Sequence, residues 1–452
     1  MKLRNILALL LTIAMAFSMI ACSAAKTAEA TAEPAEATEA PAATEAAATE
    51  APAAEPIQLH AWAWLTNVDG LYEAAKEYEA LTGVKIELTI DTIAAADILT
   101  NLTTTNESGD LSSLPDIILM QDTDSFKNIA NYPDLFYDVT SYVDWTQVAE
   151  AKAALTSKDG LHYGVPFDSG SSIAMYRTDI LKKAGYTVAD LTGITWDRLI
   201  EIGEDVYAKT GSYLLSDTWE MILAQMITST GASLFNEDGS ANIAGNAAVI
   251  AAIETYKEAI DKHVIYNASD WNDYVASFNG GSVAAGVING CWIAMIVNAA
   301  KDQANLWAAT DLPNFASIST SSHGTNFGGS SWFVLNKSEN ADAAAKFLSY
   351  MFAGEGMNTY ADYMTKTLGF ITTYQPVVTS GYYDTVEDAF YSDGFWSTVA
   401  KAAAAAPVFP TSVMYVSTFG YITNAMQEVL AGTDVTAALA TAQSNVDFEF
   451  GK

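Results

Sequence analysis

The sequence predicts an α/β fold of two lobes, with three crossings of the chain from one lobe to the other. First, the chain of 452 residues is longer than a single hydrophobic core usually organises. Second, strand-like and helix-like segments alternate, which indicates that each lobe is a mainly parallel sheet flanked by helices. Third, irregular stretches at 160–179, 326–335 and 372–376 interrupt this alternation. Two lobes joined at such stretches can close on a ligand by hinge motion.

The N-terminal region is predicted to contain a targeting signal followed by a flexible tether. Lys2 and Arg4 precede an apolar stretch at 6–20, which has the length of a signal peptide and is short for a membrane span. The residues that lead into Cys22 resemble a bacterial lipobox. We therefore expect a signal peptide at 1–21 and acylation of Cys22, with a plain secretory signal as the alternative. Residues 22–56 are mostly Ala, Thr, Glu and Pro without periodicity, which predicts a disordered tether.

The first lobe is predicted from strand and helix patterns that begin at residue 57. A period of two in the first strand places Trp62 and Trp64 on one face. We expect Trp62 or Trp64 to form one wall of the cleft between the lobes, with Trp64 as the more exposed of the two. The third strand is continuously apolar and delivers Asp122 at its carboxyl end, where α/β sheets bind ligands. The expected segments are strands at 57–64, 84–90 and 114–120 and helices at 71–81 and 94–104.

The first crossing is predicted where a Pro-Phe-Asp-Ser-Gly break separates two apolar strands within 160–179. Asp168 in this break is expected to accept hydrogen bonds from a ligand, and Gly170 would allow a close approach of the backbone. An ordinary loop within one sheet is the alternative interpretation. For Asp168, a structural capping role is the alternative to ligand contact.

The second lobe follows this crossing. Thr195 is expected to be a helix N-cap, and a buried strand at 283–288 carries Asn289 and Trp292 toward the cleft. Trp271 opens one of the predicted helices. The expected helices, which include those after the second crossing, are 181–184, 198–209, 219–230, 247–262, 271–278, 340–351, 397–406, 419–430 and 435–446, and a further strand is expected at 307–313.

The second and third crossings also contribute candidate ligand contacts. The paired glycines Gly328 and Gly329 precede an apolar strand, so Ser330 and Trp332 are expected to lie along the second crossing. Tyr374 lies in the third irregular stretch. For each tryptophan, packing in the core is the alternative to contact with a ligand.

Composition excludes several classes of partner. The formal net charge is −33, which disfavours electrostatic binding of nucleic acid or of an anionic membrane surface. The four histidines have no metal-ligand spacing, and no motif predicts a metal or other cofactor. The two cysteines, Cys22 and Cys291, are predicted to have different fates, so we expect no disulfide.

Several stretches in the same order resemble the family 1 extracellular solute-binding proteins of bacterial carbohydrate ABC importers. They include HAWAW at 60–64, DGLHYGVPFDSG at 159–170, TWDRLIEIGE at 195–204 and GGSSWFVLNKSENADAAAKFLSYM at 328–351. Each motif alone is weak, and their order makes the resemblance fairly specific. It implies a periplasmic-binding-protein-like clamshell of type II, similar in fold to maltose-binding protein, with lobes at 57–168 plus 331–372 and at 169–330 plus 373–452.

The resemblance also implies that the protein is a monomer that binds a sugar without catalysis and docks on the permease subunits of an importer. It would sit on the outer face of the cell membrane, held only by its lipid. Flat aromatic rings match the apolar faces of sugars, and carboxylate, amide and hydroxyl groups match sugar hydroxyls. The candidate ligand contacts are Trp62, Trp64, Asp122, Asp168, Gly170, Trp271, Asn289, Trp292, Gly328, Gly329, Ser330, Trp332 and Tyr374.

Two other functions remain open from the sequence. A binding protein of the same fold for a polyamine would also suit an acidic chain. A secreted glycoside hydrolase would carry similar aromatic residues, and it would need two carboxyl groups about 5–10 Å apart across the scissile bond.

Overall fold

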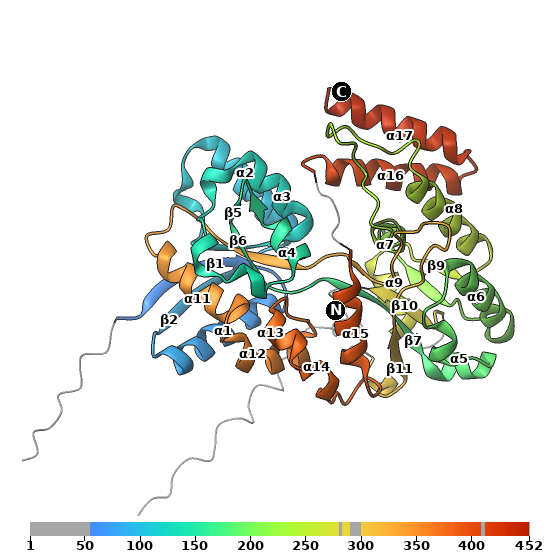
Figure 1. Cartoon of the computed structure of the whole chain (residues 1–452), viewed down its shortest axis with the longest axis horizontal. Helices are drawn as coiled ribbons and strands as arrows, with labels where there is room; N and C mark the ends of the chain where they lie inside the picture. The colour runs from blue at the N-terminus through green and yellow to red at the C-terminus, as the bar shows by residue number, and fades with distance from the viewer. Residues whose placement is uncertain (1–54, 280–282, 290–299, 408–411, 452) are drawn as a thin grey trace, which may run out of the picture. The chain divides into compact units, whose positions relative to one another are not determined.

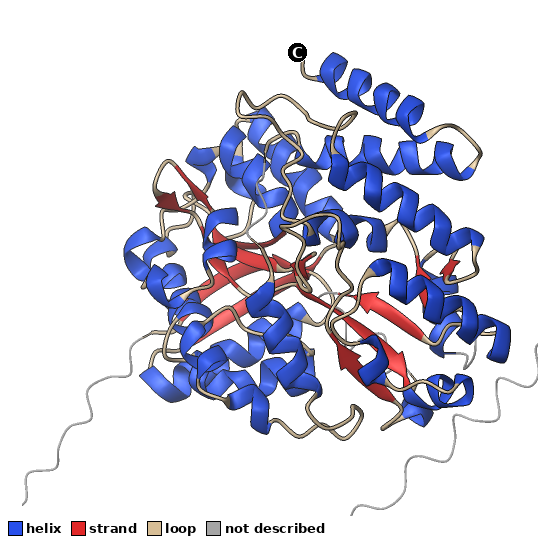
Figure 2. Cartoon of the chain, turned by 45° about the vertical axis from the view of Figure 1, so that its right-hand side comes forward, coloured by secondary structure: helices blue, strands red, loops and turns tan. Residues whose placement is uncertain are grey.

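A computed structural model describes residues 55–279, 283–289, 300–407 and 412–451. Two mixed sheets, each covered by helices, organise these residues (Figures 1 and 2). The predicted signal peptide and Cys22 lie outside the described residues, as does almost all of the predicted tether. No helix in the described part of the chain is long and apolar enough to cross a membrane.

The first sheet has the strand order β2-β1-β3-β13-β6. Strand β1 runs parallel to β2 and β3, and β13 runs antiparallel to β3 and β6. The strands are β1 (Ile57–Ala63), β2 (Ile86–Thr92), β3 (Ile117–Gln121), β6 (Gly164–Pro166) and β13 (Ser330–Val334). The helices around them are α1 (Asn67–Thr82), α2 (Ala95–Ser108), α3 (Asp122–Asn131), α4 (Glu150–Leu155), α11 (Ala341–Ala353) and α12 (Met357–Tyr363).

Alternate residues of β1 and β3 pack on opposite faces of this sheet, as a period of two requires. Ala61 and Leu119 belong to the core that includes α1 and α11, whereas Trp62 and Ile118 belong to the core with Ile98 of α2. Because helices cover both faces, side chains in the middle of these strands are buried. Only residues at the strand ends are left to contact a ligand.

The second sheet has the order β11-β7-β10-β8-β9, with β12 paired to β7. Strand β10 is parallel to β8 and β8 to β9, whereas β7 is antiparallel to its neighbours. The strands are β7 (Ser171–Arg177), β8 (Leu215–Asp217), β9 (Ile265–Asn267), β10 (Gly286–Asn289), β11 (Trp307–Thr310) and β12 (Thr325–Asn326). The helices are α5 (Thr178–Ala184), α6 (Trp196–Thr210), α7 (Met221–Ser229), α8 (Ala247–Asp261), α9 (Trp271–Asn279), α15 (Phe395–Ala405), α16 (Tyr415–Leu430) and α17 (Val435–Glu449).

The prediction of mainly parallel sheets was wrong in this detail, because both sheets are mixed. Strands β7 and β13 follow the first and second crossings, and each enters its sheet antiparallel to both of its neighbours in the strand order. The remaining elements are a small β4–β5 pair (Ser157–Lys158 and Leu161–His162), helices α13 (Gln375–Thr379) and α14 (Tyr382–Thr385), a π-helix at Met364–Leu368, and short 3-10 turns.

The three predicted crossing stretches lie side by side. Asp168 forms an isolated β-bridge with Thr372, and the Phe327 N–H donates to the Gly170 carbonyl at 2.9 Å. Gly170 has a φ of +59°, and a Cβ atom placed on it would lie 2.4 Å from the Gly328 carbonyl oxygen. The close backbone approach predicted at Gly170 is therefore an approach to the second crossing.

Candidate functional site

A cavity of about 290 Å³ lies where the carboxyl ends of strands from both sheets meet the second crossing. Trp64 directly follows β1, Gln121 ends β3, and Trp219 lies two residues beyond β8. Ligands of α/β proteins bind at such carboxyl ends, where loops begin and side chains are not covered by helices. The lining residues are Trp64, Asn67, Gln121, Thr123, Asp168, Trp219, Met221, Phe327, Gly328, Gly329, Ser330, Phe370, Phe419 and Thr423.

Trp219 is the most exposed aromatic ring of this cavity. Its exposed fraction is 59%, whereas most large apolar side chains of the protein are buried. The ring stacks on Trp271 of α9, with centroids 5.9 Å apart and planes inclined by 16°. This stacking fixes one face of the Trp219 indole. The half-buried ring of Trp64, at the end of β1, lines the same cavity.

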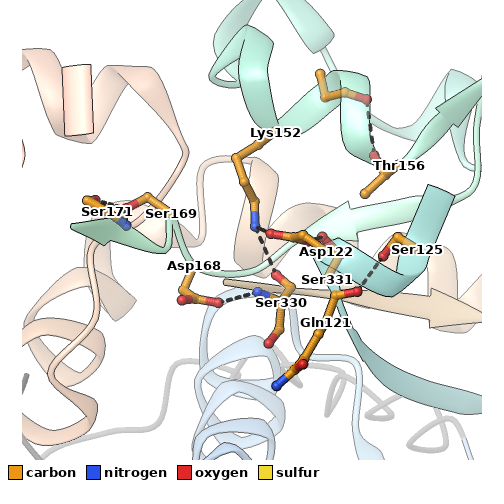
Figure 3. A network of polar contacts seen from close by, with 11 residues as sticks. Gln121, Asp122, Ser125, Lys152, Thr156, Asp168, Ser169, Ser171, Ser330 and Ser331 are labelled. Atoms are coloured by element: carbon orange, nitrogen blue, oxygen red, sulfur yellow. Dashed lines mark hydrogen bonds and ion pairs between the residues drawn. The ribbon is translucent and has the colours of Figure 1, made fainter. Parts of the chain in front are cut away.

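A buried ion pair lies beside the second crossing (Figure 3). Asp122, the first residue of α3, pairs with Lys152 of α4, and each side chain is only 1% exposed. The Ser331 hydroxyl donates to Asp122 at 2.8 Å, and the Lys152 ammonium donates to the Ser330 carbonyl at 3.4 Å. The pair therefore joins α3, α4 and β13 around the backbone of the second crossing.

Asp168 joins the first crossing to the second. Its carboxylate accepts a hydrogen bond from the Ser330 N–H at 2.7 Å (Figure 3). Burial raises the pKa of the Asp168 carboxyl, although the Lys152 charge and the Ser330 N–H act in the opposite direction. Asp168 also lines the cavity, so the carboxyl group has both a structural partner and a position from which a ligand contact is possible.

Comparisons with known proteins agree with this architecture. A family profile described as bacterial extracellular solute-binding protein matches residues 73–385. A lactose-binding protein of Rhizobium radiobacter is 36% identical over 363 residues, which are 79% of this chain and 85% of that protein. The chain belongs to the bacterial extracellular solute-binding proteins. This family binds solutes, which agrees with the prediction that the protein is not an enzyme.

This solute-binding protein is also similar to a second relative and to a solved structure. A maltooligosaccharide ABC transporter solute-binding lipoprotein of Streptococcus pneumoniae is 27% identical over 299 residues, which are 64% of this chain and 67% of the relative. The solved structure of the sugar-binding protein MalE from the phytopathogen Xanthomonas citri has a TM-score of 0.69 at 17% identity, covering 86% of this chain and 96% of that chain. The structural likeness confirms the predicted periplasmic-binding-protein-like fold.

The structure of the solute-binding protein brings five of the predicted contacts to the cavity wall: Trp64, Asp168, Gly328, Gly329 and Ser330. Three others lie close behind that wall. Gly170 packs on the Gly328 backbone, Trp271 stacks on Trp219, and Asp122 forms an ion pair with Lys152.

Three predicted contacts lie away from the cavity. Trp62 is 7% exposed in the core beside α2, where its indole N–H donates to Asp91 at 3.2 Å. Trp332 is fully buried and packs against Phe167 and Phe352. Tyr374 is buried along a separate surface groove that also includes Tyr78 and Tyr142. Trp292 lies outside the described residues, as does the side chain of Asn289.

Lys152 was not among the predicted contacts, and Trp219 was expected within a helix. The pattern at 219–230 predicts a buried helix that includes Trp219, but α7 begins only at Met221. The position of Trp219, two residues after the buried strand β8, was the signal that could have identified it as a contact. Lys152 has no sequence signal, because its partner Asp122 lies thirty residues earlier in the chain. Phe419 and Thr423 of α16 were also not predicted as contacts.

No three His, Cys, Asp or Glu side chains in the described ranges are arranged to hold a metal ion. The cavity itself is lined by aromatic rings, backbone groups and uncharged polar side chains. Asp168 is the one carboxyl group among its described lining residues. This arrangement suits a neutral ligand that has both apolar faces and hydrogen-bonding groups.

Asp217, at the end of β8 behind Trp219, predicts a measurable dependence of stability on pH. Burial raises the pKa of its carboxyl to about 7. A raised pKa in the folded state stabilises the protein below the ordinary pKa, and this stabilisation is lost as the pH rises through the folded value. The free energy of unfolding of Asp217→Asn should therefore vary less than that of the wild type between pH 4 and about 7, by roughly 1.4 kcal/mol per unit of pKa displacement.

Denaturant unfolding of both proteins across this pH range would measure the difference. If the free energy of unfolding changed equally with pH in the two proteins, the raised pKa of Asp217 would be contradicted.

Proposed function

We propose that this solute-binding protein captures a carbohydrate in the cavity and delivers it to an ABC importer. The relatives named for lactose and for maltooligosaccharides support a carbohydrate ligand. The chain spans 85% of the length of the lactose-binding relative, so a corresponding cavity can be expected in both proteins. The structure supplies an independent reason in the chemistry of the cavity wall.

The observation that carries this proposal is an exposed indole face beside uncharged hydrogen-bonding groups. Trp219 offers a flat ring that matches the C–H face of a pyranose. Gln121 of β3 and Thr423 of α16 can hydrogen-bond to hydroxyl groups at the rim of the sugar. A ligand that contacts both Trp64 and Trp219 would link the two sheets.

The alternatives fit this wall less well. A polyamine would need several free carboxylates, but Asp122 is already paired with Lys152, and Asp168 is the one carboxyl group among the described lining residues. A glycoside hydrolase needs a pair of carboxyl groups across the bond that it cleaves. A single carboxyl that is held by the Ser330 N–H is poorly suited to either role.

The remaining parts of the proposal concern location and motion. We propose that 57–168 plus 331–372 and 169–330 plus 373–452 move as two lobes that close on the ligand. The body is tethered through 22–56 to a diacylated Cys22 on the outer face of the membrane. There it docks, as a monomer, on the permease subunits. The lipoprotein relative supports the anchor, and mass spectrometry of the membrane-bound protein would detect the acyl chains on Cys22.

A thermal-shift screen tests the ligand class. Binding to the folded state raises the melting temperature by mass action. We expect lactose or another sugar in a panel of pentoses, hexoses, disaccharides and malto- or arabino-oligosaccharides to raise it, and spermidine to have no effect. A response to spermidine with none to any sugar would overturn the proposal.

Replacement of Trp219 is expected to weaken binding of the sugar that this screen selects. Trp219→Ala removes the exposed stacking face and should raise the Kd by about tenfold to a hundredfold, as for a well-placed aromatic contact. Isothermal titration calorimetry would measure the change. Phe448→Ala is a matched control, because Phe448 is 89% exposed on α17 and does not line the cavity. An unchanged Kd for Trp219→Ala would remove Trp219 from the site.

A further inference from the structure

The backbone that carries Trp219 is strained. Trp219 and Glu220 are consecutive non-glycine residues with positive φ angles of 55° and 51°. Left-handed backbone is rare and costs energy for side chains of this kind, so it persists only where surrounding contacts hold it. This turn ends β8 and begins α7, and it projects the exposed ring of Trp219 into the cavity wall.

The buried carboxyl group of Asp217 stabilises this turn by hydrogen bonds. Its two oxygens accept the Ile222 N–H at 3.2 and 3.1 Å, and one of them also accepts the Tyr256 hydroxyl of α8 at 2.9 Å. Asp217 is only 1% exposed. The hydrogen bonds to Ile222 span the four residues between β8 and the second residue of α7, and Trp219 lies in that span.

Glu220 ties the same turn to another helix. It is 6% exposed, and its carboxylate accepts a hydrogen bond from the side-chain amide of Gln427 in α16. Thr423 and Phe419, which line the cavity, lie one and two helical turns before Gln427, respectively, on the same face of α16. The Trp219 turn and the α16 wall of the cavity are therefore held together by this contact.

We propose that Asp217 and Glu220 are positioning residues whose buried carboxyl groups hold the Trp219 ring in the wall of the cavity. This inference rests on the proposed function, since it assigns to these residues a role in ligand affinity. They do not contact the ligand themselves. They fix the turn so that Trp219 has one face on Trp271 and the other free.

The same geometry couples the position of Trp219 to pH. The described titratable groups that interact with Asp217 are Tyr256 of α8 and Glu220 of the turn. Its neighbours on β9 and α7, Asn267 and Ile222, are uncharged. Burial disfavours a negative charge on Asp217, and the nearby carboxyl group of Glu220 adds to this cost. Opening of the turn would expose the ionised carboxylate to water and so relieve the cost. Rising pH through about 7 therefore favours release of the Trp219 ring.

The test compares Asp217→Asn and Asp217→Ala with the wild type. An asparagine keeps an oxygen for Ile222 and Tyr256 but does not ionise, so affinity for the sugar near pH 6 should be kept and its decline between pH 6 and 8 should disappear. Alanine removes the acceptor, and Kd should rise by about tenfold, the ratio expected for loss of a buried hydrogen bond. Glu254→Ala is the matched control, because Glu254 is exposed on the same helix as Tyr256.

A second measurement needs no ligand. Acrylamide quenching of fluorescence, taken as the difference from Trp219→Phe, isolates Trp219 among the 10 tryptophans. The quenching of Trp219 should change in Asp217→Ala. In Asp217→Asn, the quenching of Trp219 should stay at its pH 6 value up to pH 8. Unchanged quenching in Asp217→Ala, or a wild-type pH profile in Asp217→Asn, would overturn the inference. If the wild type binds no sugar, the proposed function fails, while the quenching comparison still tests the positioning of Trp219.

Discussion

Replacing Asp122 with alanine is expected to lower the free energy of unfolding by about 3–5 kcal/mol, the cost of removing one partner of a buried ion pair. Lys152 would keep its ammonium group in a site where only 1% of the side chain is exposed. The Ser330 carbonyl, at 3.4 Å, is too weak a partner to replace a carboxylate. Urea denaturation of the two proteins would measure the loss.

Two further variants separate the effect of the buried Lys152 charge from that of the lost contacts of Asp122. In Asp122→Leu combined with Lys152→Met, both charges are absent, so much of the lost stability should return. Asp205→Ala breaks the surface pair with Lys209, which is half exposed, and should change stability far less. If Asp122→Ala has the same midpoint of urea unfolding as the wild type, the ion pair does not stabilise the second crossing.

Replacing Gly170 with alanine is expected to separate the first two crossings. The new Cβ atom would lie 2.4 Å from the Gly328 carbonyl oxygen and 2.6 Å from the Gly329 nitrogen, and both are backbone atoms. The residue would also keep a φ of +59°, which disfavours any side chain. Strain and overpacking together should cost about 3 kcal/mol. Because Gly328 and Gly329 line the cavity, sugar affinity should fall as well.

Gly185→Ala is the matched control for the backbone term. Gly185 has a φ of +89°, and a Cβ atom there meets nothing within 4 Å. Its substitution therefore carries the cost of left-handed backbone without the clash. The difference between the two variants in urea denaturation gives the steric part. Equal losses of stability, with wild-type affinity in Gly170→Ala, would contradict a close contact between the crossings.

The sequence patterns predicted elements and their ends better than they predicted exposure. Thr195 is the N-cap of α6, with its hydroxyl accepting the Arg198 N–H at 3.2 Å, as the pattern indicated. Strand β11, by contrast, ends at Thr310, three residues earlier than predicted. A period of two identifies two faces of a strand but does not say whether helices cover both.

The tryptophans illustrate this limit. Trp62 lies inside β1 and is covered by α2, whereas Trp64 lies one residue beyond the strand and lines the cavity. Trp332 lies in β13, between β3 and β6, where both faces of the sheet are packed. Distinguishing these rings requires the strand boundary and the neighbouring strands, which depend on contacts between distant parts of the chain.

The most direct measurement of the central claim is a crystal structure of the protein with the sugar that the thermal-shift screen selects. We predict a sugar ring stacked on Trp219, with further contacts to Trp64 and to the second crossing at 327–330. A sugar bound elsewhere on the protein, with this cavity left open, would contradict the claim that carbohydrate is captured between the two sheets.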